Sequence, residues 1–141
     1  MPSLTAQVGH GLTLLTTGDT CTAEQAEAVT TFFARSGEVI HVEEGQHATL
    51  SPLSSGGPAY FLSIADAMIE AGAIRGIPRD LARQLVTQAM AGSAAWSQDS
   101  TEDAAALRER VTAPGGAGIQ RIAELDHGAV SGFARRRACR R

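Results

Sequence analysis

The sequence predicts a mainly α fold: a helical bundle that follows a small α/β remnant, with the order strand, helix, strand, at the N-terminus. Apolar residues recur at helical spacing through most of the chain after residue 50, and the strand-like segments all lie before it. Two loops rich in small residues, at 51–58 and 111–118, divide the helical part. Because aromatic residues make up only 4% of the chain, the core must consist of small and aliphatic side chains, which suits closely packed helices.

The α/β remnant begins with a short strand. Residues 11–17 (GLTLLTT) are apolar and rich in β-branched side chains, which favours a strand. Thr22 then predicts a helix start, since Gln25 three residues later completes a capping box. We expect this helix over 23–35 and a second strand over 38–42, an order typical of the end of an α/β domain.

The clearest helix follows the loop at 51–58. Its apolar and small residues keep the spacing of one helix face: Phe61, Ile64, Ala65, Met68, Ile69 and Gly72. Asp66 and Glu70 lie on the opposite face, which favours solvated carboxylates over an acid/base pair. Around Gly72 the helix surface is narrow, so another helix can approach closely there.

Further helices complete the predicted bundle. A break at 76–78 (GIP) precedes a helix that runs to about Trp96. The next helix is expected to start at a cap at 100–101 and to end near Arg110. After the second loop, another helix is predicted over 119–126.

Composition excludes several kinds of chemistry. All twelve basic residues are arginine, so neither a phosphate-binding loop lysine nor a lysine Schiff base is available. The net charge of -3, with an acidic body before the arginine-rich end, disfavours a nucleic-acid partner. The histidines and the two cysteines match no metal-ligand spacing, so no metal is expected. No secretory signal and no apolar stretch of membrane length is apparent, so we expect no membrane partner and a cytoplasmic location.

The second loop, 111–118 (VTAPGGAG), has two interpretations. Consecutive small residues before a helix start expose backbone N–H groups, an arrangement that holds a carboxylate or phosphate. The alternative is a plain connector whose glycines permit a sharp turn. The loop at 54–58 leaves the same choice, with a turn and helix cap as the local alternative. Neither loop is a dinucleotide fingerprint, because G-x-G-x-x-G follows no strand in the sequence.

Three segments together carry a family resemblance. They are 53–61 (LSSGGPAYF), 72–81 (GAIRGIPRDL) and 107–119 (LRERVTAPGGAGI). In this order and spacing they resemble the pyrroline-5-carboxylate reductases, whose signature is usually written V-x-S-P-G-G-x-T. The resemblance implies proline biosynthesis by an oxidoreductase, in which NADPH or NADH reduces 1-pyrroline-5-carboxylate to L-proline. It also implies a homodimer whose helices interleave.

The resemblance implies a substrate site but no catalytic residue in this sequence. In the family, backbone amides of the P-G-G loop hold the substrate carboxylate. The residues at the positions of Val111 and Pro58 line the pocket. Carried over, the substrate-binding residues are Pro58, Val111, Ala113, Gly115, Gly116, Ala117 and Gly118. Two of these positions depart from the family, because Ala113 stands where serine is usual and Gly118 where threonine is usual. Both hydroxyl groups are therefore missing.

The resemblance also divides the chain into three parts. Residues 1–44 are expected to be the remnant of the end of a nucleotide-binding domain, 45–128 the helical dimerisation and substrate-binding domain, and 129–141 an arginine-rich tail. Without a dinucleotide fingerprint, no cofactor is expected to bind this chain tightly, and the chain is expected to be inactive alone. A separate nucleotide-binding chain is one expected partner. The alternatives are a non-catalytic module for dimerisation or small-carboxylate binding, or the product of a decayed gene.

Overall fold

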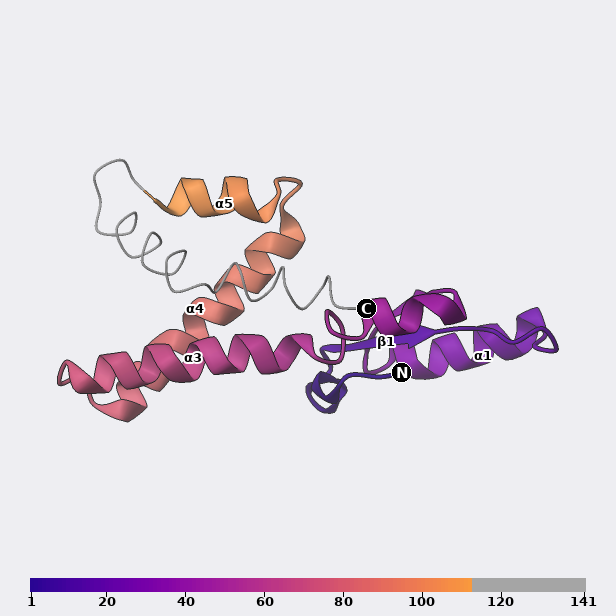
Figure 1. The fold of residues 1–141 in the computed structure, drawn as a ribbon, viewed down its shortest axis with the longest axis horizontal. Coiled ribbons are helices and arrows are strands. Elements are labelled where there is room, and N and C mark those ends of the chain that lie inside the picture. The colour runs from indigo at the N-terminus through magenta and orange to yellow at the C-terminus, as the bar shows by residue number, and fades with distance from the viewer. Residues whose placement is uncertain (113–141) are drawn as a thin grey trace. The chain divides into compact units, whose positions relative to one another are not determined.

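The computed structural model describes residues 1–112, shown in colour in Figure 1. The chain has two compact units, Met1–Ser63 and Ile64–Arg141. Long helices and one two-stranded sheet confirm the predicted class, mainly α with a strand–helix–strand remnant. Residues 113–118 of the loop predicted over 111–118, the predicted helix 119–126 and the predicted tail 129–141 lie outside the described residues. The three-part division predicted from the sequence stays a prediction.

A parallel strand pair forms the centre of the first unit. Strand β1 (Gly11–Leu15) pairs with β2 (Gly37–His41), and helix α1 (Ala23–Ala34) connects them, as the sequence predicts. The strand β1 is two residues shorter than expected. Thr16 leaves the ladder, and its hydroxyl donates a hydrogen bond of 2.7 Å to the carbonyl oxygen of Val42. A side-chain bond therefore ends the strand.

The first register pair of the sheet consists of two glycines, Gly11 and Gly37. Gly37 has φ of +147°, a conformation that L side chains rarely adopt. A Cβ atom at this position would overlap the carbonyl oxygen of Gly11. The backbones therefore approach so closely that the pair needs glycine on the β2 side.

The strand β1 also has a partner on its other edge. Pro2 forms an antiparallel bridge with Thr13, and the backbone N–H of Ser3 donates to the carbonyl oxygen of Leu12 at 3.0 Å. The side chain of Ser3 is buried and accepts from the N–H of Leu12 at 2.9 Å. With Thr13 and Leu14 also buried, β1 is the best-protected element of the first unit. The sequence did not predict this pairing, nor the 3-10 turn over Leu4–Val8 that follows it.

The predicted capping box of α1 is confirmed. The N–H of Gln25 donates to the hydroxyl oxygen of Thr22 at 3.2 Å, and the N–H of Thr22 donates to the Gln25 side-chain oxygen at 3.0 Å. Two amides at the start of the helix are thus satisfied by side chains. Two short elements that the sequence did not predict follow β2: a 3-10 turn over Glu44–Gln46 and the helix α2 (His47–Leu50).

Helix α3 (Gly57–Ile74) runs from the first unit into the second. After a turn at Gly76, where φ is +86°, the chain continues as α4 (Arg79–Asp99) and α5 (Ala104–Val111). The predicted close approach at Gly72 is confirmed, because a Cβ atom there would lie 3.3 Å from the Cβ of Ala82 on α4. Among residues 1–112, no helix combines the length and apolarity that a membrane crossing requires.

The apolar face of α3 is largely uncovered. Of its predicted stripe only Ala65 is buried, whereas Phe61 is 65% exposed and Met68 is 52% exposed. Leu85 on α4 is likewise 56% exposed. The helical periodicity of the sequence is therefore real, but the described part of the chain does not supply the surface that these side chains would pack against.

Candidate functional site

The structure describes two of the seven predicted substrate-binding residues. Pro58 lies in the first turn of α3 and is half-buried, and Val111 is the last residue of α5 and largely exposed. Pro58 belongs to the first compact unit and Val111 to the second. The other five lie outside the described residues: Ala113, Gly115, Gly116, Ala117 and Gly118. That these seven residues form one pocket stays a prediction.

Backbone N–H groups of the turn before α3 donate hydrogen bonds to carbonyl oxygens a few residues earlier in the chain. The N–H of Ser54 donates to the carbonyl oxygen of Leu50 at 3.0 Å, and the N–H of Gly56 donates to that of Ser51 at 3.1 Å. The buried hydroxyl of Ser54 also donates to the carbonyl oxygen of Leu50, at 3.1 Å. These bonds favour the structural interpretation of this loop, because the bonded N–H groups are not free to hold an anion.

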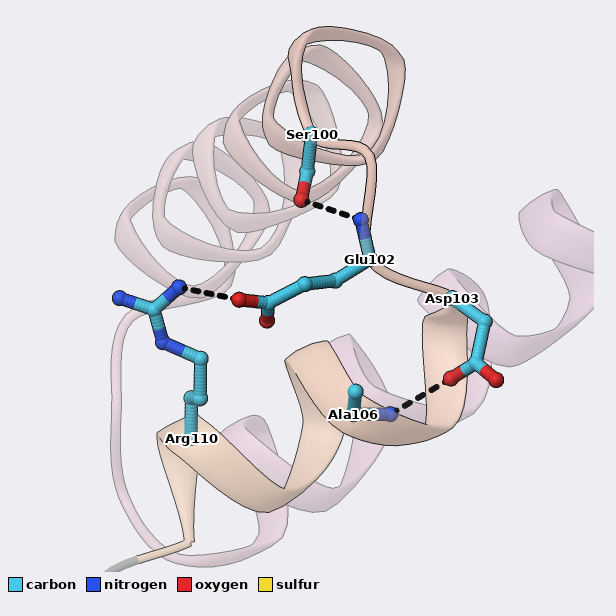
Figure 2. Close-up of polar contacts among 5 residues, drawn as sticks. All are labelled: Ser100, Glu102, Asp103, Ala106 and Arg110. Atoms are coloured by element: carbon cyan, nitrogen blue, oxygen red, sulfur yellow. Dashed lines mark hydrogen bonds and ion pairs between the residues drawn. The ribbon is translucent and has the colours of Figure 1, made fainter.

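The corner between α4 and α5 leads to the second predicted loop. Figure 2 shows its polar contacts. The carboxylate of Asp103 accepts a hydrogen bond of 2.8 Å from the N–H of Ala106, so Asp103 is the N-cap of α5. The cap predicted at 100–101 is wrong. The hydroxyl of Ser100 instead accepts from the N–H of Glu102 at 3.0 Å, which stabilises the turn after α4.

Arg110 in the last turn of α5 contacts two residues of this corner. Its Nη1 lies 3.1 Å from the carboxylate of Glu102 (Figure 2), in the connection between the helices. Its guanidinium carbon lies 5.6 Å from the ring centroid of Trp96 in α4, a cation–π distance. The sequence did not predict this cluster, since Arg110 was expected only to mark the end of a helix.

A groove of about 330 Å³ lies between α4 and α5. Trp96, Leu107 and Val111 supply much of its apolar lining, and Arg108 also lines it. Leu107 is the one buried side chain of α5. Val111, a predicted pocket residue and the first residue of the predicted loop, is thus among the residues that line this groove.

The start of α1 does not favour a bound phosphate. The N-terminus of α1 follows β1, where a dinucleotide fold would hold the pyrophosphate. Here the amide of Gln25 is already bonded to Thr22, and Glu24 places a negative charge in the first turn. Both features oppose the binding of a phosphate anion at this helix start.

Asp66 and Glu70, the carboxylate pair noted in the sequence, form ion pairs rather than a reactive cluster. Asp66 and Glu70 on α3 both pair with Arg79 at the start of α4, at 3.5 Å and 2.8 Å. The hydrogen bond to Glu70, followed by the charge of that carboxylate, raises the pKa of the Arg79 guanidinium. Within residues 1–112, no three His, Cys, Asp or Glu side chains gather as a metal site would require.

Comparison with known proteins identifies the helical part of the chain. The family model described as pyrroline-5-carboxylate reductase dimerisation matches residues 44–140. The pyrroline-5-carboxylate reductase of Mycobacterium leprae is 34% identical over 147 aligned positions, which cover 92% of this chain and 50% of the relative. The enzyme of the same name from Glycine max is 31% identical and is covered over 48% of its length.

Solved structures give the same result. A pyrroline-5-carboxylate reductase structure from Coxiella burnetii is 30% identical with a TM-score of 0.87, covering 94% of this chain and 50% of that one. The Plasmodium falciparum pyrroline carboxylate reductase, solved with NADP bound, has a TM-score of 0.92 at 22% identity over 98% of this chain and 56% of that one. This second likeness concerns the fold alone. The chain spans about half the length of the curated relatives it matches.

Proposed function

Because the chain belongs to the pyrroline-5-carboxylate reductase dimerisation family, we propose that it forms the dimerising and substrate-binding part of a reductase that makes L-proline. In this reaction a hydride adds to the C=N carbon of 1-pyrroline-5-carboxylate, and the ring nitrogen takes up a proton. The supporting observation is the family match over 44–140, which contains all seven predicted substrate-binding residues.

We assign the substrate carboxylate to the loop after α5. Its small residues leave backbone N–H groups accessible, and the sequence predicts a helix start directly after it. The amides proposed to bind are those of Gly115, Gly116, Ala117 and Gly118, and Val111 and Pro58 are proposed to line the pocket. Ala113 is included in the site at the position of the family's serine. The turn before α3 is not proposed to bind the anion, because its amides bond internally.

The hydride donor is proposed to be NADPH or NADH, bound by residues other than these 141. The sequence carries no G-x-G-x-x-G after a strand, and the N-terminus of α1 opposes a phosphate. A polypeptide of these 141 residues is therefore expected to bind the substrate carboxylate without reducing the C=N bond. A nucleotide-binding partner segment would restore the reaction.

The proposed assembly is a homodimer through α3 and α4. Both helices carry large apolar side chains that the described residues leave exposed, such as Phe61, Met68 and Leu85. Exposed large apolar side chains on these helices support an interface, since contiguous apolar patches on soluble proteins mark interaction sites. A second copy of the chain supplies the same helices, so a two-fold contact would cover both faces at once.

A second candidate is a non-catalytic module that dimerises or binds small carboxylates, or a decayed gene product. It is favoured by Ala113 and Gly118, which replace the two hydroxyl-bearing residues of the family signature. Each lost hydrogen bond to a charged carboxylate weakens binding by about 1.5–3 kcal/mol. Backbone amides alone would then bind a carboxylate weakly.

Proline binding by the 141-residue chain tests the site and separates the candidates. We expect weak calorimetric binding of L-proline by the parent chain. The double variant Ala113→Ser with Gly118→Thr should bind about a hundredfold more tightly, since it restores two hydrogen bonds to a charged group. Ala91→Ser, which adds a hydroxyl in α4 and leaves the loop sequence unchanged, is the matched control and should not alter proline affinity.

Two outcomes would contradict the proposal. An unchanged proline affinity in the double variant would remove the carboxylate assignment to the loop. Oxidation of NADPH by the purified 141-residue chain, in the presence of 1-pyrroline-5-carboxylate, would contradict the proposal that the hydride donor is bound elsewhere. Addition of a family nucleotide-binding domain should produce NADPH oxidation only if the chain is a reductase part rather than a binding module.

A further inference from the structure

We infer that Arg110 is a positioning residue: by contacting Glu102 and Trp96 it fixes the last turn of α5 on α4, and so sets the point from which the carboxylate loop departs. This inference rests on the proposed function, since it assigns a purpose to a cluster beside the predicted loop. The residues that carry it all belong to the described part of the second unit.

Two contacts hold the arginine. The Nη1 of Arg110 is 3.1 Å from the carboxylate of Glu102, and its guanidinium carbon is 5.6 Å from the centre of the Trp96 ring. Glu102 is itself held by Ser100, whose hydroxyl accepts its backbone N–H at 3.0 Å. As Figure 2 shows, Arg110 reaches from α5 across to the connection after α4. The Arg110 side chain therefore links the last turn of α5 to Trp96 of α4 and to the connection that follows α4.

Helix α5 needs such a tie because it is short. It has eight residues, and a helix of this length is unstable in water without tertiary contacts. Leu107 is its one buried side chain. Asp103 caps its first turn, and Arg110 secures its last. A single apolar anchor leaves the helix free to pivot, whereas contacts at both ends fix its direction.

The last turn of α5 leads directly into the sequence of the predicted loop. Val111 follows Arg110 and is the last residue of α5. The N–H of Thr112 still bonds to the carbonyl oxygens of Arg108 and Glu109, at 3.2 Å and 3.1 Å. The described helix turn thus continues from Arg110 to Thr112, and Ala113 is the next residue in the sequence. We therefore propose that a pivot of α5 would shift the start of the carboxylate loop.

The chain offers a matched control in Arg79. Its side chain is 59% exposed against 60% for Arg110, and it pairs with Glu70 at 2.8 Å. Arg79, however, lies at the start of α4 and pairs with carboxylates of α3. Among residues 1–112, none of its ion pairs involves α5. Substitutions at the two arginines thus remove similar surface ion pairs at opposite ends of α4.

The experiment compares Arg110→Met, Arg110→Lys and Arg79→Met in the 141-residue chain. Hydrogen exchange measures the protection of the α5 amides, calorimetry measures L-proline affinity, and the emission of Trp96, the only tryptophan, reports the guanidinium on its ring. We expect Arg110→Met to accelerate exchange in α5 but not in α3 or α4, to change the Trp96 emission, and to weaken proline binding roughly threefold to tenfold. Lysine should restore most of the affinity, and Arg79→Met should leave all three readings unchanged.

Three results separate the possible failures. Unchanged α5 exchange in Arg110→Met overturns the inference, whether or not proline binds. Faster α5 exchange with unchanged proline affinity also overturns it, because Arg110 would then be only structural. A parent chain that fails to bind proline rejects the proposed function instead. In that case, hydrogen exchange of the backbone amides that follow α5 tests the inference about Arg110. Faster exchange of these amides in Arg110→Met supports the inference, and unchanged exchange overturns it.

Discussion

The two units of the chain stabilise their structure in different ways. In the first, β1 is paired on both edges, and the buried hydroxyl groups of Ser3 and Ser54 have hydrogen-bond partners. In the described part of the second, long helices expose large apolar side chains and are tied by surface ion pairs of Arg79 and Arg110. Backbone pairing within one chain stabilises the first unit, whereas α3 and α4 carry large apolar side chains that residues 1–112 leave exposed.

This difference predicts how each unit responds to protein concentration. Backbone ladders and caps form within a chain, so their contribution to stability does not depend on a second copy. Apolar helix faces that pack between copies contribute only when the copies meet, so that contribution rises with concentration. Small residues between α3 and α4, such as Gly72 against Ala82, hold the helices together without providing a large core of their own.

The largest effect is expected from a charge on the exposed helix face. Leu85→Glu places a carboxylate where the proposed dimer buries an apolar side chain, and the two-fold contact repeats the change. An unpaired buried charge costs about 3–5 kcal/mol, so each dimer should lose at least that much free energy of association. Sedimentation velocity should show monomers at micromolar concentration, where the parent chain is a dimer.

Thr87→Glu is the matched control for this test. Thr87 lies two residues further along α4, which turns it by about 200° to the other side of the helix. The same charge at that position should leave the dimer intact. Dimers that persist in Leu85→Glu, or a parent chain that sediments as a monomer, would contradict the assignment of this face to the interface.

A smaller effect is expected from the glycine pair in the sheet. Gly37→Ala forces a side chain into a conformation with φ of +147° and against the carbonyl oxygen of Gly11. Strain and overpacking together should lower the free energy of unfolding by about 3 kcal/mol. Denaturant unfolding followed by hydrogen exchange should locate this loss in β1 and β2, independent of protein concentration.

Gly45→Ala provides the comparison for the glycine pair. No atom lies within 4 Å of a Cβ atom built at Gly45, and its φ is not positive. The free energy of unfolding should change by less than about 0.5 kcal/mol. If Gly37→Ala were as mild as this control, the close approach of β1 and β2 would not be a constraint on the first unit.

The features that the sequence predicted correctly are local. The capping box of Thr22 and Gln25 depends on two residues three positions apart, and the break at 76–78 depends on neighbouring glycine and proline. The strand, helix and strand order also follows from local patterns. Each of these signals acts within a few residues, so the rest of the fold does not alter it.

The features that the sequence missed depend on contacts between distant segments. The bridge from Pro2 to Thr13 requires the chain to fold back on β1, which no periodicity reveals. The cap of α5 had several candidates close together, and the turn that follows α4 selects Asp103. The contacts of Arg110 arise from the angle between two helices, so its spacing from Trp96 carries no helical signal. The carboxylate loop itself came from family resemblance, because a glycine-rich connector looks the same locally.

The smallest effect is expected at the start of α1. Thr22→Ala removes the hydroxyl that accepts the N–H of Gln25 and retains only the reciprocal bond from the backbone N–H of residue 22 to the Gln25 side chain. Loss of such a cap typically costs about 1 kcal/mol. Thr31→Ala, on the same helix, should instead stabilise the chain by a few tenths of a kcal/mol, roughly the difference in helix propensity. Thermal unfolding at two protein concentrations should give the same loss for Thr22→Ala at both. If the stability lost in Thr22→Ala increased on dilution, contacts with a second copy would contribute to the stability of α1. The two units would then not differ in their dependence on protein concentration.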